Sequence, residues 1–195
     1  MKVAKTVGKI GVVAAAAVAT VTMWNGGIAH ADTPFFELQP VSGQGAFFPW
    51  ESPDCVALNA AEGFYNNHTQ VFEWTCNGHP DQEWSLHFYA NAPDGSALYQ
   101  IINKQSGKCM EVADDNLFNG TAVDQFTCGA GSIDSIATQL WEAPALSAEL
   151  VPWSTMRQGW WFCLDVRGGN TDNGTVIEQW SCNGTDAQHF AQVAP

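Results

Sequence analysis

The chain has 195 residues, of which 20 are acidic and only 7 are basic, and its formal net charge is −13 at pH 7. This length suits a single domain with its own hydrophobic core. So acidic a chain repels nucleic acid and anionic membrane surfaces, so we expect neither as a partner and favour a neutral or cationic one.

The first 31 residues have the pattern of a secretory signal peptide. Lys2, Lys5 and Lys9 precede an apolar run that ends near Trp24, and residues 29–31 (Ala-His-Ala) have the form of a cleavage site. A membrane anchor is the alternative, but the run is shorter than the roughly 18–20 residues that span a bilayer. We therefore expect a secreted protein without membrane insertion. Residues 32–195 would keep four basic and all 20 acidic residues, a net charge of −16.

All six cysteines follow this segment: Cys55, Cys76, Cys109, Cys128, Cys163 and Cys182. An even number in an exported chain predicts disulfides. Zinc is the alternative, but zinc sites usually place two cysteines within a few residues of each other, and the sequence has no C-x-x-C. We therefore expect no metal site.

The cysteines mark a threefold repeat. Cys55, Cys109 and Cys163 are spaced 54 residues apart, and a second cysteine follows each of them after 21, 19 and 19 residues. An aromatic residue stands two positions before each second cysteine, and each unit closes on Gln-x-aromatic. Such a period predicts a repeat architecture, with units one, two and three at about residues 45–97, 98–150 and 151–193. The aromatics are Trp74, Phe126 and Trp180; the closing pairs are Gln82 and Trp84, Gln139 and Trp141, and Gln188 and Phe190.

Each unit is predicted to consist of β-strands. Residues 98–102 form an apolar, β-branched run, and residues 175–180 form another that the Asn173-Gly174 turn introduces. Asn119-Gly120 repeats that turn in unit two. No segment has a sustained helical period. Residues 32–50 are expected to supply the first strand of unit one. Units of this kind cannot bury their own apolar faces, so they must share one core.

The motifs of unit three resemble the repeat of the ricin-B lectin family. They are Cys163-Leu164-Asp165-Val166, Asn173-Gly174-Thr175, Trp180 to Gly184, and Gln188-His189-Phe190, and the likeness extends over about residues 45–193. The resemblance implies an all-β fold, a β-trefoil of three Q-x-W repeats in a single domain at 32–195. It also implies one disulfide within each unit, Cys55–Cys76, Cys109–Cys128 and Cys163–Cys182. The closing aromatics would then be core residues, and the glutamines would satisfy backbone groups.

The resemblance also implies where a sugar would bind. The family places an Asp two residues after the first cysteine, an aromatic two before the second, a polar residue two before that aromatic, and an Asn just before Q-x-W. A carboxylate is a strong acceptor for hydroxyls, and the aromatic stacks on the sugar ring. Unit three has Asp165, Glu178 and Trp180, but Ala187 replaces the Asn, and the neighbouring Asp186 is a partial substitute.

The other two units are weaker candidates. Unit two has Glu111, Asp124, Phe126 and Thr138, with a carboxylate one methylene longer than Asp. Unit one has lost the acceptor: its residues at these positions are Ala57, Phe72, Trp74 and Asp81.

The resemblance therefore implies a secreted lectin for a neutral glycan, and we expect no cofactor and no enzymatic activity. The histidines show no H-E-x-x-H spacing, and no G-x-S-x-G or phosphate-binding loop occurs. The alternative is a protein-interaction or toxin-accessory trefoil with decayed sugar sites, since tryptophan is a frequent interface residue. Its candidate contacts are Trp50, Trp153, Trp160 and Trp161.

Overall fold

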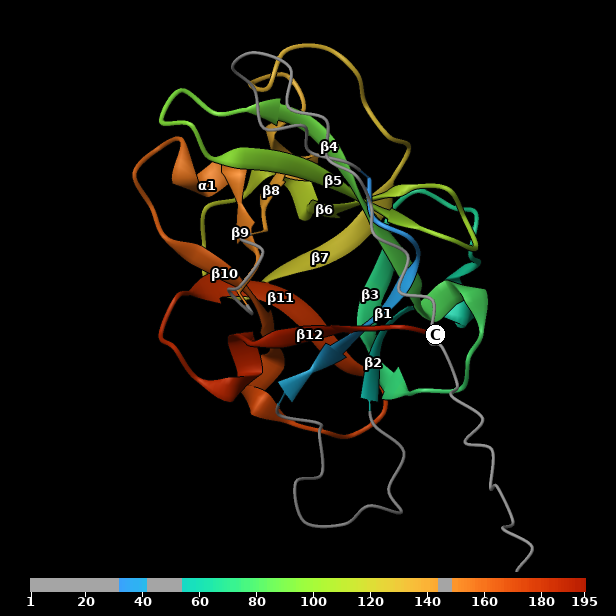
Figure 1. Ribbon diagram of the computed structural model, residues 1–195. Helices are drawn as coiled ribbons and strands as arrows, with labels where there is room; N and C mark the ends of the chain where they lie inside the picture. Colours follow the sequence, from blue (N-terminus) through green and yellow to red (C-terminus); the bar gives the residue numbers. More distant parts are fainter. Residues whose placement is uncertain (1–31, 42–53, 144–148) are drawn as a thin grey trace, which may run out of the picture.

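The computed structural model describes residues 32–41, 54–143 and 149–195 (Figure 1). The predicted signal peptide and Trp50 lie outside these residues. The described residues form twelve β-strands, several short 3-10 turns and one four-residue helix, α1 (Trp153–Met156). None of their helices is long and apolar enough to cross a membrane. The prediction of an all-β chain is confirmed.

The twelve strands divide into four for each unit. Unit one contains β1 (Phe36–Pro40), β2 (Asp54–Leu58), β3 (Thr69–Thr75) and β4 (Glu83–Asn91). Unit two contains β5 (Ala97–Asn103), β6 (Cys109–Val112), β7 (Thr121–Phe126) and β8 (Trp141–Glu142). Unit three contains β9 (Val151–Pro152), β10 (Phe162–Val166), β11 (Thr175–Ser181) and β12 (Phe190–Val193).

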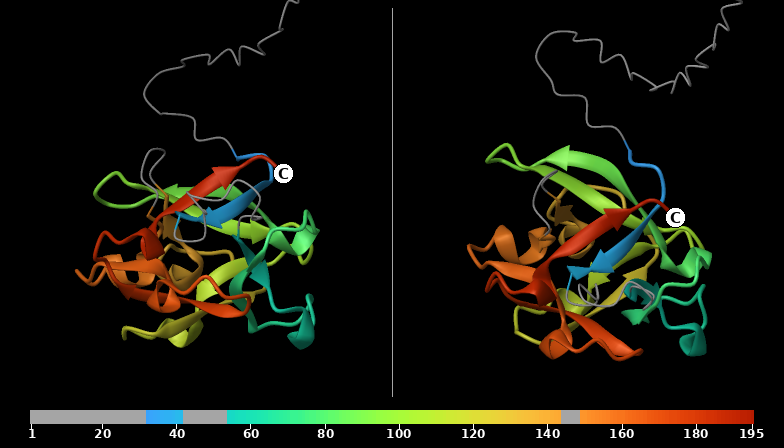
Figure 2. Two further views of the ribbon diagram at one scale, coloured as in Figure 1. Left: turned by 90° about the horizontal axis from the view of Figure 1, so that it is seen from below. Right: turned by 60° about the horizontal axis from the view of Figure 1, so that its bottom comes forward.

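The pairing of the strands gives the β-trefoil that the sequence predicts. In each unit the second and third strands form an antiparallel hairpin: β2–β3, β6–β7 and β10–β11. The third strands also pair with one another, as β3–β7, β7–β11 and β11–β3, so the three hairpins meet in a closed triangle. The remaining strands include β1, which lies beside β12 from the other end of the chain (Figure 2). The unit-one strand expected before residue 50 is β1.

The aromatic residues of the Q-x-W motifs lie in the shared core. Trp84 and Trp141 are fully buried, and Phe190 is 5% exposed. Each indole N–H finds a backbone acceptor: Trp84 donates to the carbonyl of Val56 at 2.8 Å, and Trp141 donates to that of Met110 at 3.1 Å. A buried indole N–H without an acceptor would cost about 1–3 kcal/mol, so these bonds hold each closing strand against the hairpin of its own unit.

The glutamines of the same motifs close the loop after each hairpin. In unit three the Gln188 Oε1 accepts a hydrogen bond from the Asn183 N–H at 2.7 Å, and its Nε2 donates to the Ser181 carbonyl at 3.1 Å. Gln82 makes the same two bonds in unit one, and Gln139 makes them in unit two. Backbone groups that the strands leave unpaired are thereby satisfied.

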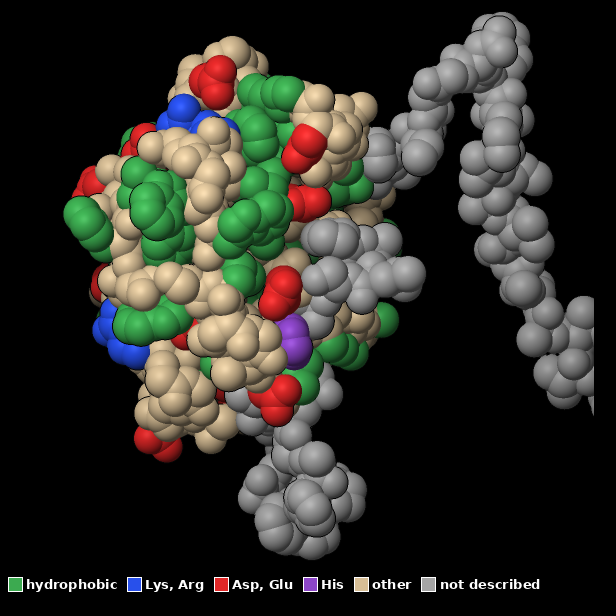
Figure 3. Space-filling view, turned by 90° about the vertical axis from the view of Figure 1, so that its left-hand side faces the viewer, with side chains coloured by type: hydrophobic (Ala, Val, Ile, Leu, Met, Phe, Trp, Pro, Cys, Tyr) green, Lys and Arg blue, Asp and Glu red, His purple; other side chains and the backbone are tan. Residues whose placement is uncertain are grey.

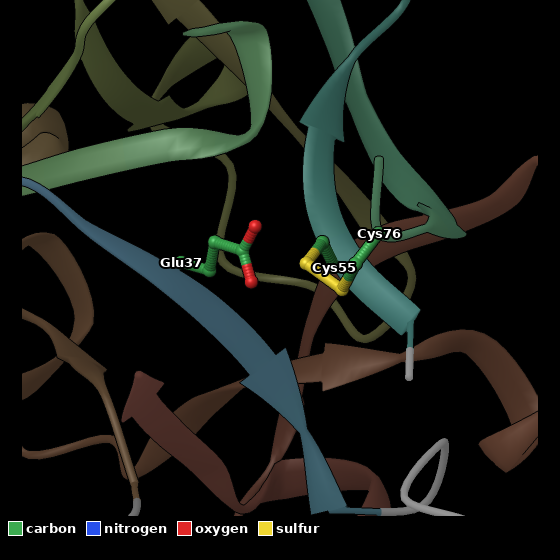
Figure 4. A group of neighbouring side chains, drawn as sticks. All are labelled: Glu37, Cys55 and Cys76. Atoms are coloured by element: carbon green, nitrogen blue, oxygen red, sulfur yellow. A yellow bond between two sulfur atoms is a disulfide. The ribbon is translucent and has the colours of Figure 1, made fainter. Parts of the chain in front are cut away.

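One disulfide lies within each unit and joins the ends of its hairpin: Cys55–Cys76, Cys109–Cys128 and Cys163–Cys182. Loops of this length are each worth roughly 3 kcal/mol in the chain-entropy model. The Glu37 carboxylate of β1 faces the Cys55–Cys76 bridge (Figure 4). The Glu37 carboxylate and the two cysteine sulfurs are close enough together to hold a metal ion. Both sulfurs are oxidised in the disulfide, however, so neither is the thiolate that a metal requires.

Three equivalent turns lock each unit to the next. They are Asn67-His68-Thr69, Asn119-Gly120-Thr121 and Asn173-Gly174-Thr175, and each middle residue has a positive φ, of 62°, 84° and 89°. Each asparagine side chain accepts hydrogen bonds from both the N–H and the hydroxyl of one residue in the following unit, with unit one following unit three. These residues are Thr127, Ser181 and Thr75, respectively. The middle residue of each turn is therefore held beside the next unit's hairpin.

Candidate functional site

The hairpin of each unit brings the predicted acceptor and polar positions opposite each other. Asp165 of β10 pairs with Glu178 of β11, and Glu111 of β6 pairs with Asp124 of β7. In unit one the equivalent pair is Ala57 and Phe72. Directly opposed residues on an antiparallel pair have side chains about 5 Å apart, so the two side chains of each pair can act on the same ligand. Each unit therefore has an equivalent site position, and the identity of the paired residues determines the chemistry of that site.

In unit three these residues line an open hollow of about 680 Å³. Asp165, Glu178, Trp180 and Asp186, which the sequence predicts for one site, all belong to its lining. Trp180 is 39% exposed, so part of its side chain is open to a ligand. Asp186 lies at the rim with an exposed side chain, and Ala187 is buried beside Gly169.

The Asp165 carboxylate is buried and held in one orientation. Its Oδ2 accepts a hydrogen bond from Gln188 Nε2 at 2.9 Å, and no described residue donates to Oδ1. Burial, together with the nearby charge of Glu178, raises the pKa of Asp165 to about 6, while the bond from Gln188 acts in the opposite direction. The Q-x-W glutamine is thus both a loop-closing residue and the group that positions the acceptor.

An arginine that the sequence analysis missed completes the hollow. Arg167 follows β10, and its Nε donates to Glu178 Oε2 at 2.5 Å. Glu178 is 2% exposed, so this ion pair neutralises a charge that burial would otherwise make costly. Arg167 is about half exposed and presents further N–H donors at the hollow. No motif position marks this residue, and only the turn after β10 brings it to Glu178.

In unit two the predicted residues Glu111, Asp124 and Phe126 also come together, but a side chain from unit one covers them. The ring of His68 packs against that of Phe126, with centroids 5.0 Å apart, and its Nδ1 lies 3.0 Å from Asp124 Oδ2. Burial is the main cause that raises the pKa of Asp124, to about 6, and also raises that of Glu111. The aromatic face that would hold a sugar is thus in contact with an imidazole.

Unit one has a smaller hollow, of about 440 Å³, with a different character. Trp74 is 41% exposed there, as Trp180 is in unit three, and its ring meets that of Phe72 edge to face. Asp81 lines the hollow, but its carboxylate is hydrogen-bonded to the His79 ring. This unit keeps the aromatic surface, and an alanine and a phenylalanine occupy the positions of the two polar partners.

Further exposed aromatic side chains lie outside these hollows. Trp160 and Trp161 are 59% and 61% exposed, Phe118 is 72% exposed, and Trp153 is buried. Phe118 and Trp160 line a separate shallow hollow with Asn119 and Ser181. Figure 3 shows hydrophobic side chains gathered in several groups on one face of the molecule.

Two family models match the chain. The model described as the ricin-type beta-trefoil lectin domain matches residues 97–194, which is half of the chain. The model of the ricin-type beta-trefoil lectin domain-like family matches residues 51–126. No curated protein sequence gives a significant match.

Solved structures share the fold at low sequence identity. The designed threefold-symmetric protein ThreeFoil is 20% identical, with a TM-score of 0.63, over 83% of this chain and 99% of its own. The Rhizoctonia solani agglutinin is 17% identical, with a TM-score of 0.62, over 87% of this chain and 100% of its own. The exo-beta-1,3-galactanase 1,3Gal43A from Clostridium thermocellum is 23% identical, with a TM-score of 0.63, over 84% of this chain but only 30% of its own.

Proposed function

This chain belongs to the ricin-type β-trefoil lectin family, and we propose that it is a carbohydrate-binding lectin whose working site is the unit-three hollow. The observation that carries the proposal is the combination of a half-exposed Trp180 ring with the fixed, buried carboxylate of Asp165 in one hollow. The agglutinin and the designed trefoil share the fold, and the family supplies the class of ligand.

The polar groups of the hollow suit a ligand rich in hydroxyls. Asp165 and Asp186 offer carboxylate acceptors, and Arg167 offers donors, so a hydroxyl can donate to one group and accept from another. Bonds to ionised groups are roughly twice as strong as those between neutral groups. The apolar face of a pyranose ring would stack on Trp180, which is 39% exposed.

The charge of the hollow and of the chain favours a neutral sugar. Three carboxylates, Asp165, Glu178 and Asp186, face one guanidinium in the hollow. An acidic sugar or a sulfated polymer would meet this excess of negative charge and the overall negative charge of the chain. The proposed ligand is therefore an uncharged glycan.

Secretion and the lack of catalysis are part of the same proposal. Three disulfides suit an oxidising compartment, which agrees with the predicted signal peptide at residues 1–31. A glycosidase needs two carboxylates at a defined separation across a scissile bond. In the hollow, Glu178 is instead tied to Arg167, and the exo-galactanase has other parts that account for most of its length.

A glycan array tests this function. The chain without residues 1–31, labelled on a lysine, is applied to arrays of neutral and acidic glycans, with Trp180→Ala as the matched control. We expect binding to a set of neutral glycans that the control does not bind. An array on which both proteins give no signal, or the same signal, would contradict the proposal.

The alternative is an interaction with a protein partner, and one observation favours it. Phe118, Trp160 and Trp161 expose large aromatic surfaces, and none of them lines the hollow of unit one or of unit three. A protein partner recovered by pull-down that is lost on Trp160→Ala, together with an empty array, would favour this alternative over the lectin.

A further inference from the structure

The site position of unit two has a side chain that the other units lack. In the turn that abuts the following unit, units two and three have Gly120 and Gly174, and unit one has His68. A Cβ placed on Gly120 would lie 3.9 Å from both Glu178 Oε2 and Trp180. A side chain at position 120 would therefore point at the site of unit three, whereas a Cβ on Gly174 would meet nothing within 4 Å. In the equivalent turn of unit one, the side chain is the imidazole of His68, and it lies at the site position of unit two.

His68 meets two buried carboxylates there. Ligating atoms of His68, Glu111 and Asp124 all lie within 4.8 Å of one another. In a tetrahedral zinc site with bonds of about 2.1 Å, ligand atoms lie about 3.4 Å apart, so only small side-chain movements separate the present arrangement from coordination. The three residues come from different parts of the sequence, and no local motif contains them.

The two carboxylates are buried in an environment that would suit metal ligands. Asp124 is 5% exposed, and its Oδ1 is buried without a hydrogen-bond partner among the described residues. Glu111 is 7% exposed, and its Oε2 is held by Gln139 Nε2 at 2.9 Å and by Thr138 Oγ1 at 3.5 Å. Outer hydrogen bonds of this kind orient ligating carboxylates. No described lysine or arginine forms an ion pair with either carboxylate.

We propose that His68, Glu111 and Asp124 bind a divalent transition-metal ion such as Zn²⁺. The ion would lie at the position in unit two that is equivalent to the proposed sugar site of unit three. One imidazole and two carboxylates are a ligand set that Zn²⁺ accepts, and the fourth position would take water. The ion replaces the hydrogen bond between His68 and Asp124, and it offsets two buried negative charges. Because His68 belongs to unit one, the ion also links units one and two.

The sequence predicts no metal site because His68, Glu111 and Asp124 are far apart along the chain and stand at no zinc-motif spacing. The signal that was present is the replacement of glycine by histidine in one of three equivalent turns. A left-handed conformation costs a residue with a side chain of order 1–3 kcal/mol, so a histidine is an unfavourable choice there unless its ring has a use.

The test measures metal binding without reference to sugar. The chain without residues 1–31 is treated with a chelator, dialysed and titrated with ZnCl₂, while its melting temperature and its calorimetric heat are recorded. We expect one ion per chain and a higher melting temperature, since an ion that binds the folded state alone stabilises it. CoCl₂ should give visible absorption bands at the same stoichiometry.

Two variants and a control make the result specific. His68→Gly restores the residue of the other units and suits the positive φ, so it should fold; Glu111→Gln keeps the shape. Each should weaken the affinity by about a hundredfold or more, because a direct ligand matters at least as much as an outer partner. His87→Gln, at an exposed histidine near Asp32, should change nothing. Absence of a melting shift, or a shift of equal size in His68→Gly, would overturn the proposal.

Discussion

Replacing Asp165 with asparagine tests its role as a hydrogen-bond acceptor for sugar without disturbing the fold. Asparagine keeps the shape and can still accept the bond from Gln188, but it removes the charge. A hydrogen bond to a charged group is worth about 1.5–3 kcal/mol, so the loss of one such bond weakens affinity roughly tenfold to a hundredfold. Titration calorimetry at pH 7.5, with a glycan from the array, measures this change.

The same variant should also remove a pH dependence. Because the pKa of Asp165 is raised to about 6, the carboxylate loses its charge as the pH falls through that value, and the wild-type affinity should then fall by up to about tenfold at pH 5. Asp165→Asn should give a flat profile. Asp172→Asn, an exposed residue of the same unit, is the matched control and should behave as the wild type.

The stability of Asp165→Asn should not fall at neutral pH. An acid whose folded pKa lies above its unfolded value gives stability below the unfolded value, near 3.8, and loses it as the pH rises through about 6. The shift corresponds to at most about 3 kcal/mol, less because the hollow is open to water. The variant should therefore melt no lower than the wild type at pH 7.5. Unchanged affinity, or affinity lost together with a large drop in melting temperature, would refute the reasoning.

Three further predictions concern the aromatic surface, a disulfide and a buried acid. Trp180→Ala should abolish measurable sugar binding in calorimetry and lower stability by about 1–2 kcal/mol, less than the 3–5 kcal/mol expected for a fully buried aromatic. Replacing Cys163 and Cys182 by serine should cost about 2–5 kcal/mol in urea unfolding, and an unchanged midpoint would contradict this. Glu73 is fully buried, and burial, followed by the charge of Asp54, raises its pKa to about 8, so wild-type stability should fall as the pH rises from about 4.5 through 8. Glu73→Gln should therefore melt higher than the wild type at pH 9 but not at pH 4, and an equal difference at both would exclude this cause.

The fold could be predicted because the same sequence motifs occur three times along the chain. The 54-residue cysteine period and the Gln-x-aromatic endings recur in register, and residues in register occupy equivalent places in a symmetric fold. The repetition also shows that Glu73 is an exception at its position. The equivalent residues of the other two units are Gln125 and Gln179, whose amides donate to backbone carbonyls of the preceding unit. A carboxyl at this place can donate only when it is protonated.

The site was predictable only in part, because some of its contacts cross between motifs. Asp165, Glu178 and Trp180 stand at family positions and meet as the register of one hairpin requires. Arg167 and His68 stand in turns, and a turn residue has no sequence signal for the side chain that it will reach. The ring of His68, from unit one, packs against Phe126 of unit two. The sequence pattern within a single unit gives no information about such a contact between units.

The central claim is that this chain binds a neutral sugar on Trp180, and nuclear magnetic resonance of the indole N–H groups tests it most directly. Each tryptophan gives one signal, and Trp180→Phe and Trp74→Phe assign the two exposed rings of the equivalent hollows. The account predicts that a bound glycan shifts the Trp180 signal most and leaves that of the buried Trp84 unchanged. A glycan that shifts Trp74 or Trp160 instead, or that binds without moving Trp180, would contradict it.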